Sequence, residues 1–335
     1  MAQAAGVSTA TVSRALTNPD LLSAATRAQV FEAIRRTGYR VNRAARNLRT
    51  QRAGAVLVPD LGNPFFSQIL AGISAGFADA DQSVLIADTG SHPERGRGFV
   101  EYFRDNRVDG MISLDGGLTA EDLAQFAANG AEDRIVFACE WVQGAHFPSV
   151  RSDNETGARL AVRHLNALGH RDIAHVTGPE GSVLTRARRQ GMLDERDRLG
   201  LTSRPDWIIR GDFSIASGRD AAQRIIAMRD RPTAVFCASD MVAFGLIATL
   251  AEAGIRVPQD ISVMGFDDIE MSGCYIPALT TIRQDRHRLG LRAAELLTAR
   301  LEGGADAAPD DHAELIDVTL IARHSTGPVP PRAET

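Results

Sequence analysis

The feature that most limits what this chain can fold into is a repeated alternation of short β-rich runs with longer amphipathic stretches. In the first half the runs are AVLVP, SVLIAD, DGMISL and RIVFACE, separated by stretches with helical spacing such as PFFSQILAGISAGFADA. A second set follows Ser149 and contains DIAHVTG, DWIIRG, TAVFCASD and ISVMGFD. This alternation predicts α/β architecture with parallel sheets covered by helices on both faces, and two sets predict two doubly wound lobes.

Two late segments are expected to join the lobes. TTIRQD crosses back to the first lobe, and AELIDVTLIARHS supplies the last strands. We therefore expect a first lobe of residues 53–153 and 286–313, a second lobe of residues 154–285 and 314–325, and a disordered tail at 326–335.

Charge divides the chain into a basic head and an acidic body. Residues 1–52 carry nine arginines against Asp20 and Glu32, a net charge of +7, whereas the whole chain has −5 and the remainder therefore −12. A basic segment joined to an acidic body is typical of a polyanion-binding arm on a domain that itself repels nucleic acid.

Composition excludes several other classes. The longest apolar runs, such as Ala55 to Val58, are far shorter than the ~18 to 20 residues of a membrane span, and no signal-peptide pattern is present, so we expect a cytoplasmic protein with no membrane partner. The three cysteines show no metal-ligand or redox spacing. Neither a metal nor a cofactor is predicted, since the sequence lacks a phosphate-binding motif, a strand-linked dinucleotide-binding motif, a zinc-protease motif and a GxSxG elbow between a strand and a helix.

The basic head has the pattern of an all-α helix-turn-helix domain over residues 1–41. In AGVSTATVSRAL, Gly6 suits a tight turn and Ser8 suits a helix N-cap, while Val12 and Ala15 recur at helical spacing. The opposite face carries small residues and Arg14, which allows the helix to enter a DNA major groove. The alternative is a surface helix that happens to carry small residues. SAATRAQVFEAIRRTGYR, with Ser23 as its cap, supplies a further helix.

Four linked segments resemble the lactose-repressor/galactose-repressor (LacI/GalR) family of bacterial transcription regulators. They are GVSTATVSRAL, TRAQVFEAIRRTGYRVNRAARNLRT, VPDLGNPFF and ISVMGFDDIEMSGCYIPALTTIRQDRHRLG. The resemblance extends over essentially the whole chain. It implies a core of the periplasmic-binding-protein-like type behind the DNA-binding head.

By this resemblance, one group of residues reads bases: Thr9, Ala10 and Arg14. A second group contacts or positions phosphates: Ser8, Thr11, Ser13, Tyr39, Asn42 and Arg43. An arginine can form a bidentate pair with guanine, worth ~1 to 3 kcal/mol of discrimination. Arg14 as a merely solvated helix charge is the alternative. Only MAQAA precedes Gly6, less than the family's first helix, and we therefore expect the natural start to lie upstream.

Residues 42–52 form the predicted hinge. NRAARNLRT contains one large apolar residue, Leu48, and is shorter than the ~12 to 15 residues that make an isolated helix even marginal in water. In the family this segment folds on operator DNA, and leucines of two subunits wedge into the minor groove. Leu48 as an ordinary helix-packing residue is the alternative.

Candidate ligand residues lie after β-rich runs or, for Arg188, in the opening of the helix that follows one, where the crevice of such a sheet opens. They are Asn63, Phe65, Phe66, Arg188, Phe213, Ser239 and Asp267. Aromatic faces with charged hydrogen-bonding groups suit a sugar, and the family places its effector against all of these but Asn63 and Phe66. Core aromatics, helix caps and surface ion pairs are the alternatives. Arg286 could join Arg188 in binding a sugar acid or phosphosugar, or instead pair with Asp285 or Asp267.

The sequence therefore predicts a ligand-responsive repressor rather than an enzyme. We expect a homodimer, since the tail lacks a heptad repeat, with Phe66, Ile69, Leu70 and Ile73 as candidate dimer contacts. Such a dimer would bind a pseudo-palindromic double-stranded operator. A solute-binding protein of a sugar uptake system and a sugar-modifying enzyme are the two alternatives.

Overall fold

The computed structural model describes residues 2–17, 21–37, 53–78, 83–90, 98, 103, 107–128, 132–303 and 313–329. The chain divides into two compact units, Met1–Gln51 and Arg52–Thr335. We call them the head and the core.

The described part of the head contains three short elements around a small apolar centre. They are η1 (Gln3–Ala5), α1 (Thr9–Thr17) and α2 (Ala24–Thr37). Both predicted N-caps are confirmed: Ser8 Oγ accepts the Thr11 amide at 3.1 Å, and Ser23 Oγ accepts the Thr26 amide at 3.2 Å. The centre of the head consists of Ala5, Val12, Ala15, Val30 and Ala33. With so little apolar area, each cap matters for the stability of the head.

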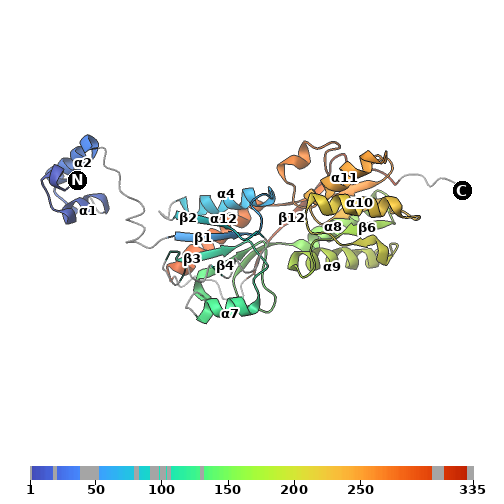
Figure 1. Cartoon of the computed structure of the whole chain (residues 1–335), viewed down its shortest axis with the longest axis horizontal. Coiled ribbons are helices and arrows are strands. Elements are labelled where there is room, and N and C mark those ends of the chain that lie inside the picture. Colours follow the sequence, from blue (N-terminus) through green and yellow to red (C-terminus); the bar gives the residue numbers. More distant parts are fainter. Residues whose placement is uncertain are drawn as a thin grey trace. The chain divides into compact units, whose positions relative to one another are not determined.

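The first lobe of the core is a six-stranded parallel sheet in the order β11-β5-β4-β3-β1-β2. The strands are β1 (Ala53–Val58), β2 (Ser83–Asp88), β3 (Gly110–Ser113), β4 (Ile135–Ala138), β5 (Ser149–Ser152) and β11 (Ala313–Ile316). Its helical elements within the described ranges are α4 (Phe65–Gly76), α7 (Ala120–Ala128), η4 (Glu132–Arg134) and α12 (Arg286–Leu301). Figure 1 shows α4 and α7 on opposite sides of the strands, and α12 shares one apolar cluster with α4.

Alternate residues of each central strand serve the two faces of this sheet. Val56 and Val58 belong to the apolar cluster shared with α4 and α12, whereas Leu57 between them belongs to the cluster shared with α7. Since both faces are buried, the strand reads as an unbroken apolar run. The two helices α4 and α12 approach closely because Gly72 and Gly290 lie at their crossing.

The second lobe repeats this plan with a four-stranded parallel sheet in the order β7-β6-β8-β9. Its strands are β6 (Ile173–Val176), β7 (Ile208–Ile209), β8 (Ala234–Cys237) and β9 (Ser262–Met264), and β10 (Thr281–Gln284) pairs antiparallel with β12 (Val318–Ile321). Its helical elements are α8 (Asn154–Ala167), α9 (Val183–Arg198), η5 (Pro205–Trp207), α10 (Ile215–Ala227), α11 (Asp240–Glu252) and η6 (Glu270–Gly273). Two parallel-sheet lobes agree with the fold class predicted from the sequence.

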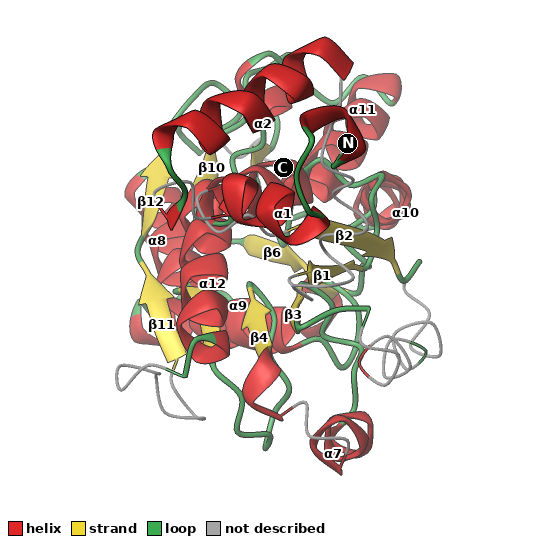
Figure 2. Cartoon of the chain, turned by 90° about the vertical axis from the view of Figure 1, so that its left-hand side faces the viewer, coloured by secondary structure: helices red, strands yellow, loops and turns green. Residues whose placement is uncertain are grey.

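The chain passes between the lobes three times, after β5, after β10 and after β11. The last crossing differs from the expectation. β11 pairs with β5 through residues 313–316, so residues 314–316 belong to the first lobe and the chain crosses at Asp317. Figure 2 shows β12 following on from β11. The free edge of β5 offers backbone partners to these residues, which the alternating pattern of the segment cannot reveal.

The expectation of a disordered tail from residue 326 is wrong for residues 326–329. The Thr326 hydroxyl lies 2.9 Å from His164 Nε2, the Gly327 carbonyl lies 3.0 Å from His170 Nε2, and the Val329 amide donates to the Leu168 carbonyl at 3.0 Å. These contacts attach the segment to the second lobe. None of the described helices is both long and apolar enough to span a bilayer.

Candidate DNA-reading helix and ligand cavity

Helix α1 presents a small, exposed face with one long cationic side chain. Thr9, Ala10 and Arg14 are exposed, whereas Val12 and Ala15 are buried against the rest of the head. At 100° per residue, the exposed positions fall on one face and the buried ones on the other. This face has the size and chemistry needed to enter a major groove.

The remaining residues expected at DNA divide into two groups. Ser8 and Thr11 lie at the start of α1, where their hydroxyl oxygens are 2.9 Å apart, so they share one cap. The side chain of Ser13 lies outside the described residues, as do four whole residues, Tyr39, Asn42, Arg43 and Leu48. The proposed hinge therefore rests on the sequence alone.

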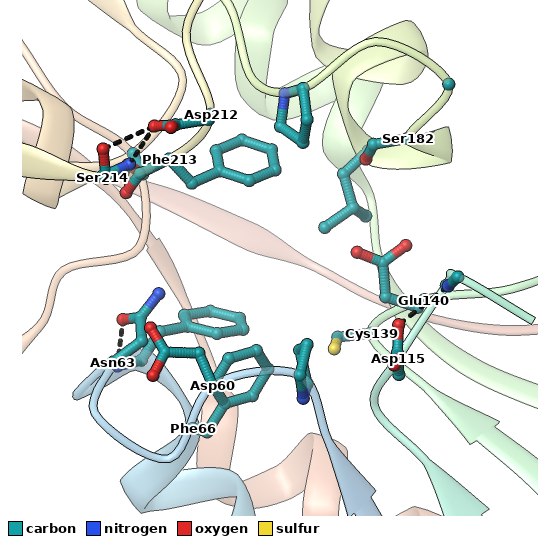
Figure 3. A pocket seen from close by; sticks show the side chains of 18 of the residues that line it. Asp60, Asn63, Phe66, Asp115, Cys139, Glu140, Ser182, Asp212, Phe213 and Ser214 are labelled. Atoms are coloured by element: carbon teal, nitrogen blue, oxygen red, sulfur yellow. Dashed lines mark hydrogen bonds between the residues drawn. The ribbon is translucent and has the colours of Figure 1, made fainter. Parts of the chain in front are cut away.

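The core contains a cavity of about 540 Å³ between its two lobes. It lies at the carboxyl ends of the parallel strands, as expected for this class of sheet. Its lining consists of Pro59, Asp60, Asn63, Phe65, Phe66, Asp115, Gly116, Gly117, Cys139, Glu140, Pro179, Glu180, Gly181, Ser182, Leu184, Arg188, Asp212, Phe213, Ser214, Ser239 and Asp267. All of the ligand residues suggested by the sequence, except Arg286, lie in this lining. Figure 3 shows Asn63 and Phe66 facing Phe213 across the open space.

The start of α4 positions two aromatic rings in the cavity wall. Asn63 Oδ1 accepts the Phe65 amide at 3.0 Å, a turn that begins the helix. The rings of Phe65 and Phe66 then meet edge to face, with centroids 5.1 Å apart. On the opposite wall the Phe213 ring lies over Gly178, where a Cβ atom would come within 2.1 Å of the ring. These rings offer apolar faces to a ligand held between the lobes.

Among the described residues that line the cavity, Arg188 of α9 is the only cationic one, and it is held rigidly. Its side chain is 3% exposed, Nε donates to Asn154 Oδ1 at 2.8 Å, and Nη1 donates to the Ala238 carbonyl. Nη1 also lies 3.7 Å from Asp267 Oδ1, and the guanidinium carbon lies 3.9 Å from the Phe266 ring centroid. With these partners the arginine is preorganised, and burial lowers its pKa against the opposing effect of Asp267.

Asp267 shares the buried region behind the cavity with Asp240, the first residue of α11. Asp267 accepts the Gln284 side-chain amide at 2.7 Å, and Asp240 accepts the hydroxyls of Ser272 and Thr281, each at 2.6 Å. Burial raises the pKa of both carboxyls, and the charge of Asp267 raises that of Asp240 further. Thr281 and Gln284 belong to β10, so these hydrogen bonds link the cavity to the strand that precedes one of the three crossings.

Strained backbone collects around the same region. Within the described part of the chain, four non-glycine residues have positive φ: Cys139 (60°), Phe213 (68°), Asp267 (120°) and Asp268 (54°). The first three line the cavity, and the fourth follows directly. Such conformations cost about 1 to 3 kcal/mol each and persist where the surroundings fix them, commonly at ligand sites.

Arg286 does not face this cavity, and the expectation that it would join Arg188 there is wrong. Arg286 is the first residue of α12, and its Nη1 donates to the carbonyls of Pro64 at 3.3 Å and Phe65 at 3.4 Å in the first lobe. It also donates to the Asp268 carbonyl at 3.2 Å and to Glu270 at 3.3 Å in the second. The residue therefore ties the two lobes together. The alternative was that Arg286 pairs with Asp285 or Asp267. Its acidic partner is instead Glu270, and Asp285 accepts the Arg288 amide as the N-cap of α12.

The sequence analysis missed several carboxylates of the lining: Asp60, Asp115, Glu140, Glu180 and Asp212. Asp60, Asp115 and Asp212 follow directly after β-rich runs, and Glu140 closes one. The strand-end rule that found Phe65 and Asp267 would have found these as well. In the described ranges, no group of three histidine, cysteine or acidic side chains is arranged to hold a metal ion.

Both the head and the core match families of known proteins. Residues 1–42 match the family described as bacterial regulatory proteins, lacI family, and residues 162–326 match the periplasmic binding protein-like domain. The HTH-type transcriptional repressor CytR of Escherichia coli K12 is 37% identical over 332 residues, covering 97% of this chain and 95% of the relative. The chain belongs to the LacI family of bacterial regulatory proteins. Because this relative is matched from head to core and is a repressor, the solute-binding alternative is set aside in favour of a LacI-family regulator.

Solved structures of the LacI family agree with the fold described above. A Lac repressor dimer bound to operator and the anti-inducer ONPF is 33% identical, with a TM-score of 0.85 and 97% coverage of both chains. A complex of the transcriptional regulator CelR with cellobiose is 28% identical, with a TM-score of 0.73, 97% coverage of this chain and 98% of the other.

Proposed function

We propose that this LacI-family protein is a homodimeric repressor that binds a pseudo-palindromic double-stranded operator and leaves it when a small polyhydroxylated effector enters the core cavity. The observation that carries the proposal is that one chain combines an exposed, capped helix carrying Arg14 with a cavity between two lobes. The operator in the Lac repressor complex and the cellobiose in the CelR complex support both partners by analogy. Acting on DNA, the protein works in the cytoplasm and needs no enzymatic activity.

Within this proposal, Thr9, Ala10 and Arg14 read bases. Ser8, Thr11, Ser13, Tyr39, Asn42 and Arg43 hold the phosphates, and Leu48 wedges into the minor groove. A hinge of this length is not stable alone, so it folds only where two hinges meet on DNA. Anything that separates the first lobes of a dimer then weakens DNA binding.

The core supplies the means of separating them. A ligand in the cavity contacts residues of both lobes, including Phe65 and Phe66 of the first and Phe213 of the second. Closure around the ligand requires movement at the three crossings and at Arg286, which bonds to both lobes. A coupling free energy of ~1 to 3 kcal/mol between ligand and DNA would be typical of such regulators.

The proposal is tested by substituting Arg14. With DNA from the protein's own promoter region, Arg14→Ala should reduce operator preference by about 1 to 3 kcal/mol, the range for one bidentate arginine–guanine pair. Arg256→Ala serves as the matched control, because Arg256 is an exposed arginine of the core that pairs with Asp260. Equal losses of promoter preference in the two variants, or none in Arg14→Ala, would contradict the assignment of α1.

A further inference from the structure

The charge of the cavity lining is strongly one-sided. Six carboxylates line it, contributed by Asp60, Asp115, Glu140, Glu180, Asp212 and Asp267, against the single guanidinium of Arg188. That guanidinium is already occupied by Asn154, the Ala238 carbonyl and Asp267. A sugar acid or a phosphosugar would therefore enter a site that repels it and offers no free cation from the described lining.

Most of these carboxylates have partners within the protein. Asp115 accepts the Thr89 hydroxyl at 2.6 Å and the Gly117 amide at 2.8 Å, and Asp212 accepts the Ser214 amide at 2.9 Å. Glu180 pairs with Arg210, and Asp267 accepts from Gln284. Their hydrogen-bonding capacity is largely used in shaping the loops.

Glu140 is different. Among the described residues, its Oε2 atom is enclosed yet has no hydrogen-bond partner. It sits against Gly116, where a Cβ atom would come within 2.5 Å of that oxygen. Figure 3 shows the carboxyl group projecting into the cavity near Asp115 and Cys139. Because leaving an enclosed acceptor unpaired is unfavourable, the Glu140 carboxyl would gain from a hydrogen-bond donor, and a ligand can bring one to it from the cavity side.

The surroundings of Glu140 favour its neutral form at pH 7 when no counter-charge is brought to it. Burial raises the pKa of Glu140 to about 8, the nearby Asp115 raises it, and Arg188 opposes the shift. The neighbouring thiol of Cys139 has its pKa raised by burial as well and carries no charge. A cation placed next to Glu140 would reverse this balance, since an opposite charge within hydrogen-bonding distance favours the ionised carboxylate.

We infer that the effector is a polyhydroxylated compound carrying a positively charged nitrogen, such as an amino sugar, and that this nitrogen binds Glu140. The inference rests on the proposed function, since it names the ligand of the same cavity. The faces of Phe65, Phe66 and Phe213 fit both parts of such a ligand, because aromatic faces accept C–H surfaces and attract cations. The surrounding carboxylates add to the attraction.

Matched sugars test the ligand class directly. The thermal unfolding midpoint of the full-length protein would be measured with glucosamine, glucose and glucuronate, and with the corresponding galactose series, at equal millimolar concentrations. At least one amino sugar should raise the midpoint and bind about tenfold or more tightly than its neutral counterpart, with the acid weakest. A neutral or acidic sugar that binds as well as its amino counterpart, or no shift with either amino sugar, would overturn the inference.

Glu140→Gln then tests the residue. This change keeps the shape of the side chain and should reduce the preference for the amino sugar over its neutral counterpart by about tenfold or more. Glu252→Gln is the control, because Glu252 is an exposed glutamate of α11 that pairs with Arg219 outside the cavity. Calorimetry in buffers of different ionisation enthalpy should show proton release on amino-sugar binding to the wild type and none with Glu140→Gln. Binding without proton release in the wild type, or undiminished preference in the variant, would contradict the role of Glu140.

Failure of this inference is distinguishable from failure of the proposed function. Promoter binding without ligand does not depend on Glu140, so a mobility-shift assay reports on the regulator alone. A protein that binds its promoter but prefers a neutral sugar refutes only the ligand class. One that shows no promoter preference refutes the regulator, whatever the sugars do.

Discussion

Replacing Arg188 by methionine should destabilise the core severely, because it leaves a buried carboxylate without its counter-charge. Arg188 and Asp267 are 3% and 7% exposed at their side chains, and the arginine also satisfies Asn154 and the Ala238 carbonyl. Removing one partner of a buried pair typically costs about 3 to 5 kcal/mol. We expect a loss in this range in the free energy of unfolding of the core.

The assay is urea unfolding followed by tryptophan fluorescence. The chain has two tryptophans, Trp141 in the first lobe and Trp207 in the second, so the signal reports on the core and not the head. In the double variant Arg188→Met/Asp267→Asn, the buried charge is gone and we expect about half or more of the lost stability to return.

The way in which the stability loss of Arg188→Met changes with pH provides an independent test. Without Arg188, the pKa of Asp267 should rise further above its unfolded value, so its protonated form stabilises the fold at low pH and that contribution is lost as the pH rises. The destabilisation should therefore be smaller at pH 5 than at pH 8. A variant as stable as the wild type, or a loss insensitive to both pH and the second substitution, would refute the reasoning.

Three further outcomes are expected. Gly290→Ala places a Cβ atom 2.0 Å from the Ile69 carbonyl at the α4–α12 crossing, and urea unfolding should show a loss of about 1 to 3 kcal/mol in the free energy of unfolding. The control Gly273→Ala meets open space and should change this free energy little. Burial lowers the pKa of His175 to about 4, so its stabilising contribution is present above pH 6.5 and is lost as the pH falls toward 4. Urea titrations should show the free energy of unfolding of the wild type falling by up to about 3 kcal/mol relative to that of His175→Leu over this interval. Parallel pH curves for the two proteins would contradict this prediction. Ser23→Ala removes the N-cap of α2 and should destabilise the head by about 1 kcal/mol, seen as faster amide exchange at Val30 in the full chain, while Ser23→Asp should restore protection.

Much of the architecture follows from the sequence because both lobes obey one rule. Apolar runs buried on both faces, such as Val56 to Val58, predict central parallel strands, and the residues just after them predict the cavity wall. That rule located Phe65 and Asp267 without any knowledge of how the lobes meet.

What the sequence could not supply was the choice among long-range partners. Arg286 is the first residue of α12, and only the approach of the Pro64 and Asp268 carbonyls from different lobes decides that its guanidinium points away from the cavity. In the same way, residues 313–316 pair with β5, and Thr326 reaches His164 across the fold. These contacts depend on tertiary placement, which local patterns do not encode.

Glu140 shows a different limit. The sequence presents it as the polar end of an apolar run, and its value as a ligand group comes from the enclosure of one oxygen atom. Only the three-dimensional surroundings reveal an unpaired acceptor.

The central claim, that this chain reads a specific DNA sequence, is tested most directly by measuring its affinity for duplex DNA at physiological salt. Fluorescence anisotropy would compare DNA from the protein's own promoter region with a shuffled duplex of the same composition and length. The account predicts binding to the promoter at least about a thousandfold tighter, the lower end for sequence-specific proteins. Equal affinity for the two duplexes would contradict it.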